Sequence, residues 1–118
     1  TTAGTIWRGI VTEKVYGFIG LAMKAGKVIS GETGCEKAIR SRKASLVIVS
    51  EDASLNTRKK FKDACSYYGI SFCVFGEKEK IGRCLGKGVR SVIAITDENF
   101  SGRLTRLMEE TKQNTGVG

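Results

Sequence analysis

Apolar residues recur along the chain at two different spacings. Val15, Phe18, Ile19 and Ala22 follow the three-to-four-residue spacing of a helix with one buried face. The run Leu46-Val47-Ile48-Val49 is continuously apolar instead, which is typical of a strand covered on both faces. The chain is therefore expected to contain both helices and buried strands.

The predicted strands are short and are separated by helices. Strands are expected at 27–30, 45–50, 71–75 and 91–95. Helices are expected from Thr12, a possible N-cap, to Lys24, from the turn at Gly31 onward, up to Gly69, after Gly76, and after the cap residue Asp97. This α-β-α-β-α-β-α-β-α order predicts an α/β sandwich whose sheet is covered by helices on both faces.

Each helix after the first also has an apolar face that should point inward. These faces are Cys35, Ala38 and Ile39; Phe61, Ala64, Cys65 and Tyr68; Ile81, Cys84 and Leu85; and Phe100, Leu104, Leu107 and Met108. A chain of 118 residues is long enough for one core but not for two. One domain is expected over residues 11–112, after a poorly patterned extension at 1–10 and before a frayed tail at 113–118.

The charge changes the picture from a generic α/β domain to one with an anionic partner. The chain has 20 Lys and Arg against 12 Asp and Glu, a net charge of +8 and a pI near 9.5. Nucleic acid is the partner that such a balance favours. A membrane surface fits less well, because no predicted helix combines a basic face with a broad aromatic one. Neither a membrane span nor a secretion leader is expected. The cysteines, which are expected to be buried and reduced, predict a cytoplasmic protein.

Cysteine and histidine usage argues against metal and redox chemistry. Four widely spaced cysteines, Cys35, Cys65, Cys73 and Cys84, form no C-x-x-C pair, and the chain has no His. Their apolar neighbours predict four buried, reduced thiols and no metal site or cofactor. Catalysis would need a base from Asp, Glu, Lys or a thiolate. The acidic pair at 51–52 follows a strand but has no recognisable partners, so we expect a protein that is not an enzyme.

The turn at residues 31–38 is the candidate for anion binding. A strand leads through Gly31-Glu32-Thr33-Gly34 into a helix, and the first N–H groups of a helix lack intrahelical partners. Those groups and the helix dipole favour an anion, and Lys37 should project outward beside it. The site could hold a phosphate or read the acceptor edge of a guanine. An ordinary strand-to-helix connection with a solvated lysine is the alternative.

Two weaker motif matches can be set aside. Residues 31–34 fit the G-x-x-G pattern of a KH domain, but KH places that loop between two helices and here a strand precedes it. Residues 82–88 partly match a phosphate loop. They have one residue too few between the glycines and no Ser or Thr after the lysine, so ATP binding is not expected.

Five blocks of sequence, in order, resemble the kink-turn RNA-binding proteins of the ribosomal L-seven-Ae and L-thirty-e type, including their small bacterial YlxQ-like members. The blocks are the 27–38 turn, Leu46-Val47-Ile48-Val49-Ser50-Glu51-Asp52-Ala53, Tyr68-Gly69-Ile70, Ile81-Gly82-x-x-Leu85-Gly86 and Val92-Ile93-Ala94-Ile95. The resemblance implies a three-layer α/β/α sandwich with a mixed four-stranded sheet. It also implies a non-catalytic protein that binds a sharply bent RNA with tandem G·A pairs.

The resemblance also implies two groups of RNA-contacting residues. In the family, the turn into the second helix reads guanines, and the loop before the last strand covers bases flipped out at the kink. The matching positions are Gly31, Glu32, Thr33, Gly34, Glu36 and Lys37 in the turn, and Lys87, Gly88, Val89 and Arg90 in the loop. Thr33 and Gly34 stand where the family usually has Asn and Glu, and Glu36 where it usually has Thr.

The sequence thus predicts a non-catalytic protein that recognises a kinked, structured RNA, possibly ribosomal RNA, in ribosome assembly or translation. Arg40, Arg42 and Lys43 could touch phosphates farther along the duplex, whereas Lys59, Lys60 and Lys62 could equally be a solvated helix face. Two alternatives remain open: an adaptor subunit without nucleic acid, and an accessory domain that acts in trans with an RNA methyltransferase.

Overall fold

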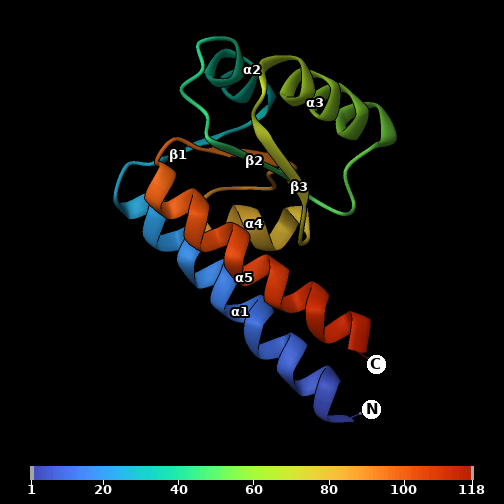
Figure 1. The fold of residues 1–118 in the computed structure, drawn as a ribbon. Helices are drawn as coiled ribbons and strands as arrows, with labels where there is room; N and C mark the ends of the chain where they lie inside the picture. The colour runs from blue at the N-terminus through green and yellow to red at the C-terminus, as the bar shows by residue number, and fades with distance from the viewer. Residues whose placement is uncertain (1, 118) are drawn as a thin grey trace.

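A computed structural model describes the backbone of residues 2–117 and the side chains of residues 9–110. Helices and strands alternate throughout (Figure 1). In chain order they are α1 (Thr2–Lys24), β1 (Val28–Ser30), α2 (Glu32–Arg40), β2 (Leu46–Val49), α3 (Leu55–Tyr68), β3 (Ser71–Val74), α4 (Lys78–Cys84), β4 (Val92–Ile95) and α5 (Glu98–Val117).

The four strands form one mixed sheet in the order β1-β4-β2-β3. β4 is antiparallel to both of its neighbours, and β2 is parallel to β3. Ser30 pairs with Ile93, and Val49 pairs with Val92. Because of these directions, β1, β2 and β3 all end where β4 begins. We call this end of the sheet the Ser30 end.

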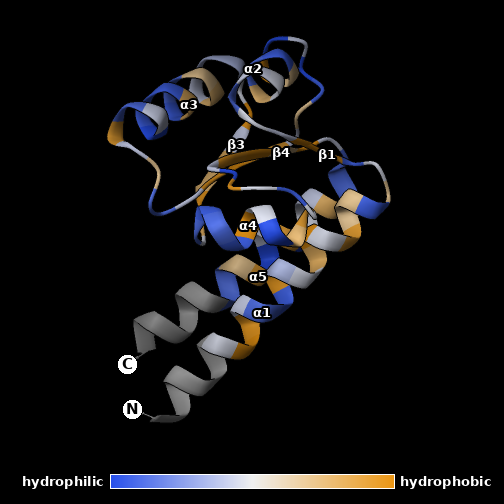
Figure 2. Cartoon of the chain, turned by 180° about the vertical axis from the view of Figure 1, so that it is seen from behind, coloured by the Kyte–Doolittle hydropathy of each residue, from blue (hydrophilic) through white to orange (hydrophobic). Residues whose placement is uncertain are grey.

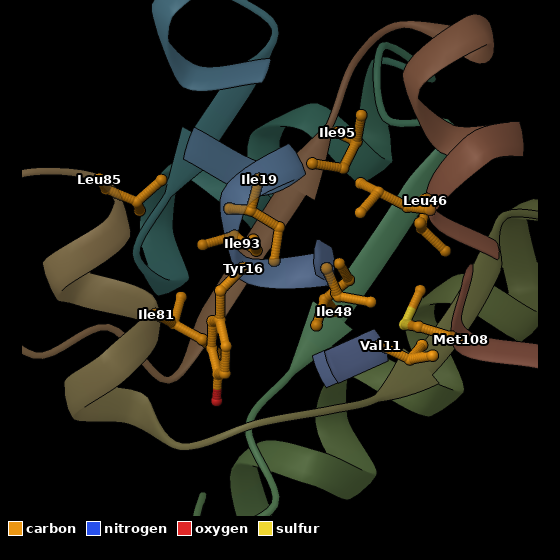
Figure 3. Close-up of a cluster of buried hydrophobic side chains, with 12 residues drawn as sticks. Val11, Tyr16, Ile19, Leu46, Ile48, Ile81, Leu85, Ile93, Ile95 and Met108 are labelled. Atoms are coloured by element: carbon orange, nitrogen blue, oxygen red, sulfur yellow. The ribbon is translucent and has the colours of Figure 1, made fainter. Parts of the chain in front are cut away.

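The sheet separates two apolar cores, as alternating strand residues require. Ile48, Ile93 and Ile95 face one core, with α1, α4 and α5 over them (Figure 3). Val47, Val49 and Ala94 face the other core, beneath α2 and α3. All four residues of β2 and of β4 are buried, as the continuous apolar runs predicted. Figure 2 shows hydrophobic strands between the helical layers and hydrophilic residues on α2 and α3.

Local sequence explains where several helices begin and end. Ser54 caps α3 by accepting a hydrogen bond from the Thr57 N–H, and Asp97 accepts one from the Phe100 N–H at the start of α5. Gly69 ends α3 in the left-handed conformation that glycine adopts at little cost.

The predicted fold class is confirmed: the protein is an α/β/α sandwich with a mixed four-stranded sheet. One difference lies at the N-terminus, where α1 begins at Thr2 instead of Thr12. The prediction of a frayed tail falls on residues whose side chains lie outside the described part of the chain; the backbone is helical to Val117. Among the described residues, no helix is long and apolar enough to cross a membrane.

The predicted core residues are largely confirmed, with corrections at three residues. Tyr16 was not among the predicted core residues, but it is 7% exposed and its hydroxyl accepts a hydrogen bond from the Glu77 N–H. All four cysteines are free, but only Cys35 and Cys65 are buried. Cys73 and Cys84 are half-buried, because Cys73 lies in the edge strand β3 and Cys84 in the last turn of the short helix α4.

Candidate nucleic-acid interface

The loops at the Ser30 end bring the two predicted contact regions together. Backbone hydrogen bonds join the Gly31 N–H to the Val92 carbonyl, and the Ser50 N–H to the Ser91 carbonyl. The turn into α2 therefore lies directly beside the start of β4 and the loop that precedes it. Residues far apart in the sequence, at 31–37 and 87–90, share one end of the molecule.

The start of α2 is open to a ligand. Its N-cap is Gly31, with φ 88° and ψ 157°, and no side chain caps the first turn. A Cβ at Gly31 would meet no atom within 4 Å, so glycine is required here by the positive φ and not by crowding. Without a capping side chain, the first N–H groups and the positive end of the helix dipole face outward.

The exposed face of α2 carries three of the predicted contact residues. Thr33, Lys37 and Arg40 follow the i, i+4, i+7 spacing of one helix face, opposite the buried Cys35, Ala38 and Ile39. All three are exposed. This face offers one hydroxyl and two cations, starting at the open end of the helix.

Glu32 and Glu36, also predicted contact residues, are engaged by another helix. Both carboxylates form ion pairs with Lys60 of α3, Glu32 at 3.8 Å and Glu36 at shorter range. The hydrogen bond to Glu36 is the main cause of the raised pKa of Lys60. Lys60 is thus not merely part of a solvated helix face. Both acidic side chains are turned toward α3, to one side of the Thr33–Lys37–Arg40 face.

Gly34 lies in the helix with little room for a side chain. Its φ is not positive, so the backbone itself would accept another residue. A Cβ at Gly34, however, would be 2.9 Å from Cγ2 of Ile29 in β1. Any larger residue, including the glutamate usual in the family, requires the Ile29 side chain to shift.

The loop from Gly86 to Ser91 is fixed by contacts with α4 and with β1. The Lys87 N–H donates to the Gly82 carbonyl, and a Cβ at Gly82 would overlap the Gly88 carbonyl. Lys87 and Val89 are exposed, Val89 by 53%. The loop therefore presents one cation and one apolar side chain from a closely packed base.

Arg90 is the residue that ties this loop to the α2 turn. Its Nε donates to Ser30 Oγ at 3.3 Å, and its Nη1 donates to the carbonyl of Val89 at 2.9 Å and, more weakly, of Gly88 at 3.4 Å. The guanidinium is thus already used within the protein at two of its nitrogens. This internal use was not foreseen, because Ser30 and Arg90 are distant in the sequence.

Asp52, half of the acidic pair considered for catalysis, has a local structural role. It is fully exposed and accepts a hydrogen bond from the Lys78 N–H at the start of α4, which lowers its pKa. A carboxylate of this kind caps a helix. Among the described residues, no cluster of three or more His, Cys, Asp or Glu is arranged to hold a metal ion.

A groove of about 960 Å³ lies at the opposite end of the sheet, near the start of α5. Basic and acidic residues line it in equal number: Arg42, Lys43, Arg106, Asp97, Glu98 and Glu109. Its charges therefore balance, and it does not favour an anion. Arg42 lies over the ring of Tyr68 there, at 5.9 Å from the centroid, away from the Ser30 end.

Fold and site together define a small, basic α/β/α domain with an open helix start beside a glycine-containing loop that is hydrogen-bonded to α4. The family model described as "Ribosomal protein L7Ae/L30e/S12e/Gadd45 family" matches residues 13–105, so the chain belongs to this family. The match spans both candidate contact regions.

Curated relatives and solved structures extend this finding. The chain is 42% identical over 94 residues to the RNA-binding protein YlxQ of Bacillus subtilis, covering 80% of this chain and 94% of that protein. It is 45% identical over 98 residues to the YlxQ of Enterococcus faecium, covering 82% and 93%. A solved protein of unknown function from Bacillus halodurans has a TM-score of 0.79 at 38% identity, covering 81% of this chain and 97% of that one. The Giardia lamblia 15.5kD RNA binding protein shares the fold, with a TM-score of 0.72 at 17% identity, covering 88% and 89%.

Proposed function

We propose that this protein binds structured RNA at the Ser30 end, and that its target is a kinked, kink-turn-like RNA containing G·A pairs. Two relatives at 42% and 45% identity are named RNA-binding proteins, and they are matched over more than nine-tenths of their length. The net charge of +8 supports an anionic partner.

The observation that carries the proposal is the union of two unlike contact surfaces at one end of the sheet. The open start of α2 offers N–H groups and Lys37, and the neighbouring loop offers Lys87 and the apolar Val89. The Arg90–Ser30 hydrogen bond holds the two surfaces together. A sharply bent RNA has phosphates, exposed base edges and unstacked bases close to one another, so such a pair of surfaces suits it better than a straight duplex.

Each surface has a distinct task in this proposal. Lys37 donates to the O6 and N7 acceptors of a guanine, and the first-turn N–H groups of α2 donate to a phosphate oxygen. Arg40, one turn further along the same face, contacts a phosphate. Val89 covers a base that has left the stack, and Lys87 holds the adjoining backbone. In this proposal the residues of both surfaces bind RNA, and none of them catalyses a reaction.

The affinity of the Lys37→Ala variant for two different RNAs shows whether Lys37 recognises a base or only attracts the negative charge of the backbone. In gel-shift titrations, the wild type should prefer a kinked G·A-containing RNA over a straight duplex of equal length. Lys37→Ala should weaken the kinked complex by about 1–3 kcal/mol and change the duplex much less. Lys62→Ala, which removes the same charge from an exposed position of α3, is the matched control. Equal losses on both RNAs would reduce Lys37 to a generic phosphate contact.

Thr33→Asn tests whether the turn faces the bases. Thr33 is exposed and its hydroxyl is short, whereas an amide offers both a donor and an acceptor at longer reach. This change should tighten the kinked complex by up to one good contact, about 1–3 kcal/mol, without affecting the straight duplex. Adding Gly34→Glu should increase the affinity for the kinked RNA only a little, although glutamate is the usual residue of the family there. The Ile29 side chain must shift to make room for the new side chain. A folded Thr33→Asn protein with unchanged affinity would place the turn away from the bases.

The wider setting follows from the same features. We propose that the RNA is ribosomal or otherwise connected with translation, as the family description suggests. The four free cysteines suit a reducing compartment, which supports a cytoplasmic location.

A further inference from the structure

The acidic residues at the start of α2 pose an electrostatic problem for an RNA-binding surface. Glu32 and Glu36 lie on the same helix as Thr33, Lys37 and Arg40, within the first five residues of α2. An unpaired carboxylate there would repel phosphates that approach the open helix end. Salt near 0.1 M screens this repulsion only partly over such short separations, because the Debye length at that concentration is about 10 Å.

Lys60, on the neighbouring helix α3, forms ion pairs with both carboxylates. Its ammonium pairs with Glu32 and Glu36 together, although its side chain is 51% exposed. The Glu36 side chain is 29% exposed and that of Glu32 is 49% exposed, so neither acid is sealed from water. The ion pairs hold both acids on the α3 side of α2.

We propose that Lys60 is a positioning residue for RNA binding, which neutralises Glu32 and Glu36 and holds them away from the RNA without itself contacting it. This inference rests on the proposed function. It assigns to Lys60 a role that its neighbours on α3 do not share, and it treats Glu32 and Glu36 as residues to be shielded, not as readers of bases.

The chain provides close controls for this role. Lys59 and Lys62 are exposed on the same helix, and neither forms an ion pair within the described part of the chain. Replacing any one of the three lysines by Met lowers the net charge by the same amount. Met also keeps an unbranched apolar stem, which suits Lys60 because its Nζ lies 5.7 Å from the centroid of the Phe61 ring.

The experiment compares Lys60→Met, Lys59→Met and Lys62→Met in binding to the kinked RNA, with a melting temperature for each. Lys60→Met should weaken binding at low salt by roughly three- to tenfold, because two carboxylates then face the phosphates unpaired, whereas each control should change it by about twofold or less. The loss should appear mainly in the association rate and should shrink as salt is raised. A purely structural contribution of Lys60 would lower the melting temperature and would not disappear in salt.

Removing the carboxylates completes the test. Glu32→Gln with Glu36→Gln should restore the Lys60→Met protein to near wild-type affinity, and should leave the otherwise wild-type protein unweakened. Three results would overturn the inference: equal losses for all three lysines, no recovery in the combined variant, or weaker binding when the two Gln changes are made with Lys60 intact. The second result would make Lys60 a direct phosphate contact, and the third would make Glu32 or Glu36 a base reader.

Failure of the proposed function gives a different pattern. If the wild type binds both RNAs but shows no preference for the kinked one, kink recognition is wrong, while the lysine comparison can still be read on the straight duplex. If the wild type binds neither RNA, the proposed function and the role of Lys60 are both overturned.

Discussion

Gly82 is a single residue on which the geometry of the contact loop depends. Because a Cβ at this position would overlap the Gly88 carbonyl, Gly82→Ala forces α4 and the loop apart. We expect a loss of about 1–3 kcal/mol in the free energy of unfolding, as for other overpacked sites. Urea unfolding measures this loss, and binding to the kinked RNA should fall with it because Lys87 and Val89 are displaced.

Gly102 provides the matched control for Gly82. It is exposed in α5, and a Cβ there would meet no atom within 4 Å. Gly102→Ala should therefore raise the stability by about 0.5–1 kcal/mol, since alanine loses less conformational entropy in a helix. If Gly82→Ala were also neutral or stabilising, the close contact between α4 and the loop would not exist in solution.

The two buried thiols make stability fall in alkaline solution. Burial raises the pKa of Cys35 to about 12 and that of Cys65 to about 11, both above the ordinary value of 9.0. From about pH 9 upward the unfolded thiols lose their protons while the folded ones keep them, so the free energy of unfolding decreases with pH. Each thiol contributes a slope of about 1.4 kcal/mol per pH unit within its own window.

Cys35→Ala isolates this effect from other groups that titrate at high pH. The variant loses some packing at every pH, so the slope of stability between pH 9 and 11 is compared, not its absolute value. The slope should be shallower than in the wild type by about one proton's contribution. Identical slopes would mean that Cys35 is accessible to water in the native protein.

At the scale of elements, the contact between the loop and β1 depends on one side chain. Arg90→Ala removes the hydrogen bonds to Ser30, Val89 and Gly88, so the loop loses its side-chain contact with the end of β1, which leads into the α2 turn. We expect faster amide hydrogen exchange in the loop and weaker binding of the kinked RNA, with a smaller effect on the straight duplex. Lys87→Ala should lower the affinity for both RNAs while leaving loop exchange unchanged. The same exchange rates in Arg90→Ala and wild type would show that the loop is held by α4 alone.

The spacing of apolar residues predicted the helices and strands well, because it shows which face of each helix or strand is buried. Ile39, Phe61 and Leu104 lie in the core as their spacing required. The strand order could not be read in the same way, since it depends on pairings such as Ser30 with Ile93 that no local pattern encodes. The early start of α1 was not predicted, because the two threonines and two glycines among its first ten residues are weak helix formers that obscure the helical spacing of Ala3, Ile6 and Ile10.

In the candidate site, too, the features that depend on neighbouring residues could be predicted from the sequence, and the contacts between separate elements could not. The open turn at Gly31 and the outward direction of Lys37 follow from residues that are adjacent in sequence, and both could be predicted. The ion pairs of Lys60 and the hydrogen bond between Arg90 and Ser30 could not, because each joins separate elements. The exposed groups of the site are thus predictable from the sequence, but the residues that position them are not.

For the whole molecule, the excess of positive charge sets how binding responds to salt. Arg40 and Lys87 are exposed and are proposed to contact phosphates, as are the first-turn N–H groups of α2, and each phosphate contact releases about one counterion. The logarithm of affinity should fall with the logarithm of salt concentration with a slope of about 2 to 3. Titrations at several salt concentrations measure it, and Arg40→Ala should reduce the slope by about one. Affinity independent of salt would remove the electrostatic basis of RNA binding.

The pairing of the first and last helices has a consequence for biosynthesis. Val11, Val15 and Ile19 of α1 share a core with Leu104 and Met108 of α5, and β1 pairs only with the late strand β4 (Figure 1). In a growing polypeptide, the face of α1 that packs against α5 therefore stays uncovered until α5 has been synthesised, a delay of several seconds at about 5–20 residues per second. Over that interval the nascent N-terminal segment is a natural client for chaperones, and the native fold closes only when α5 arrives.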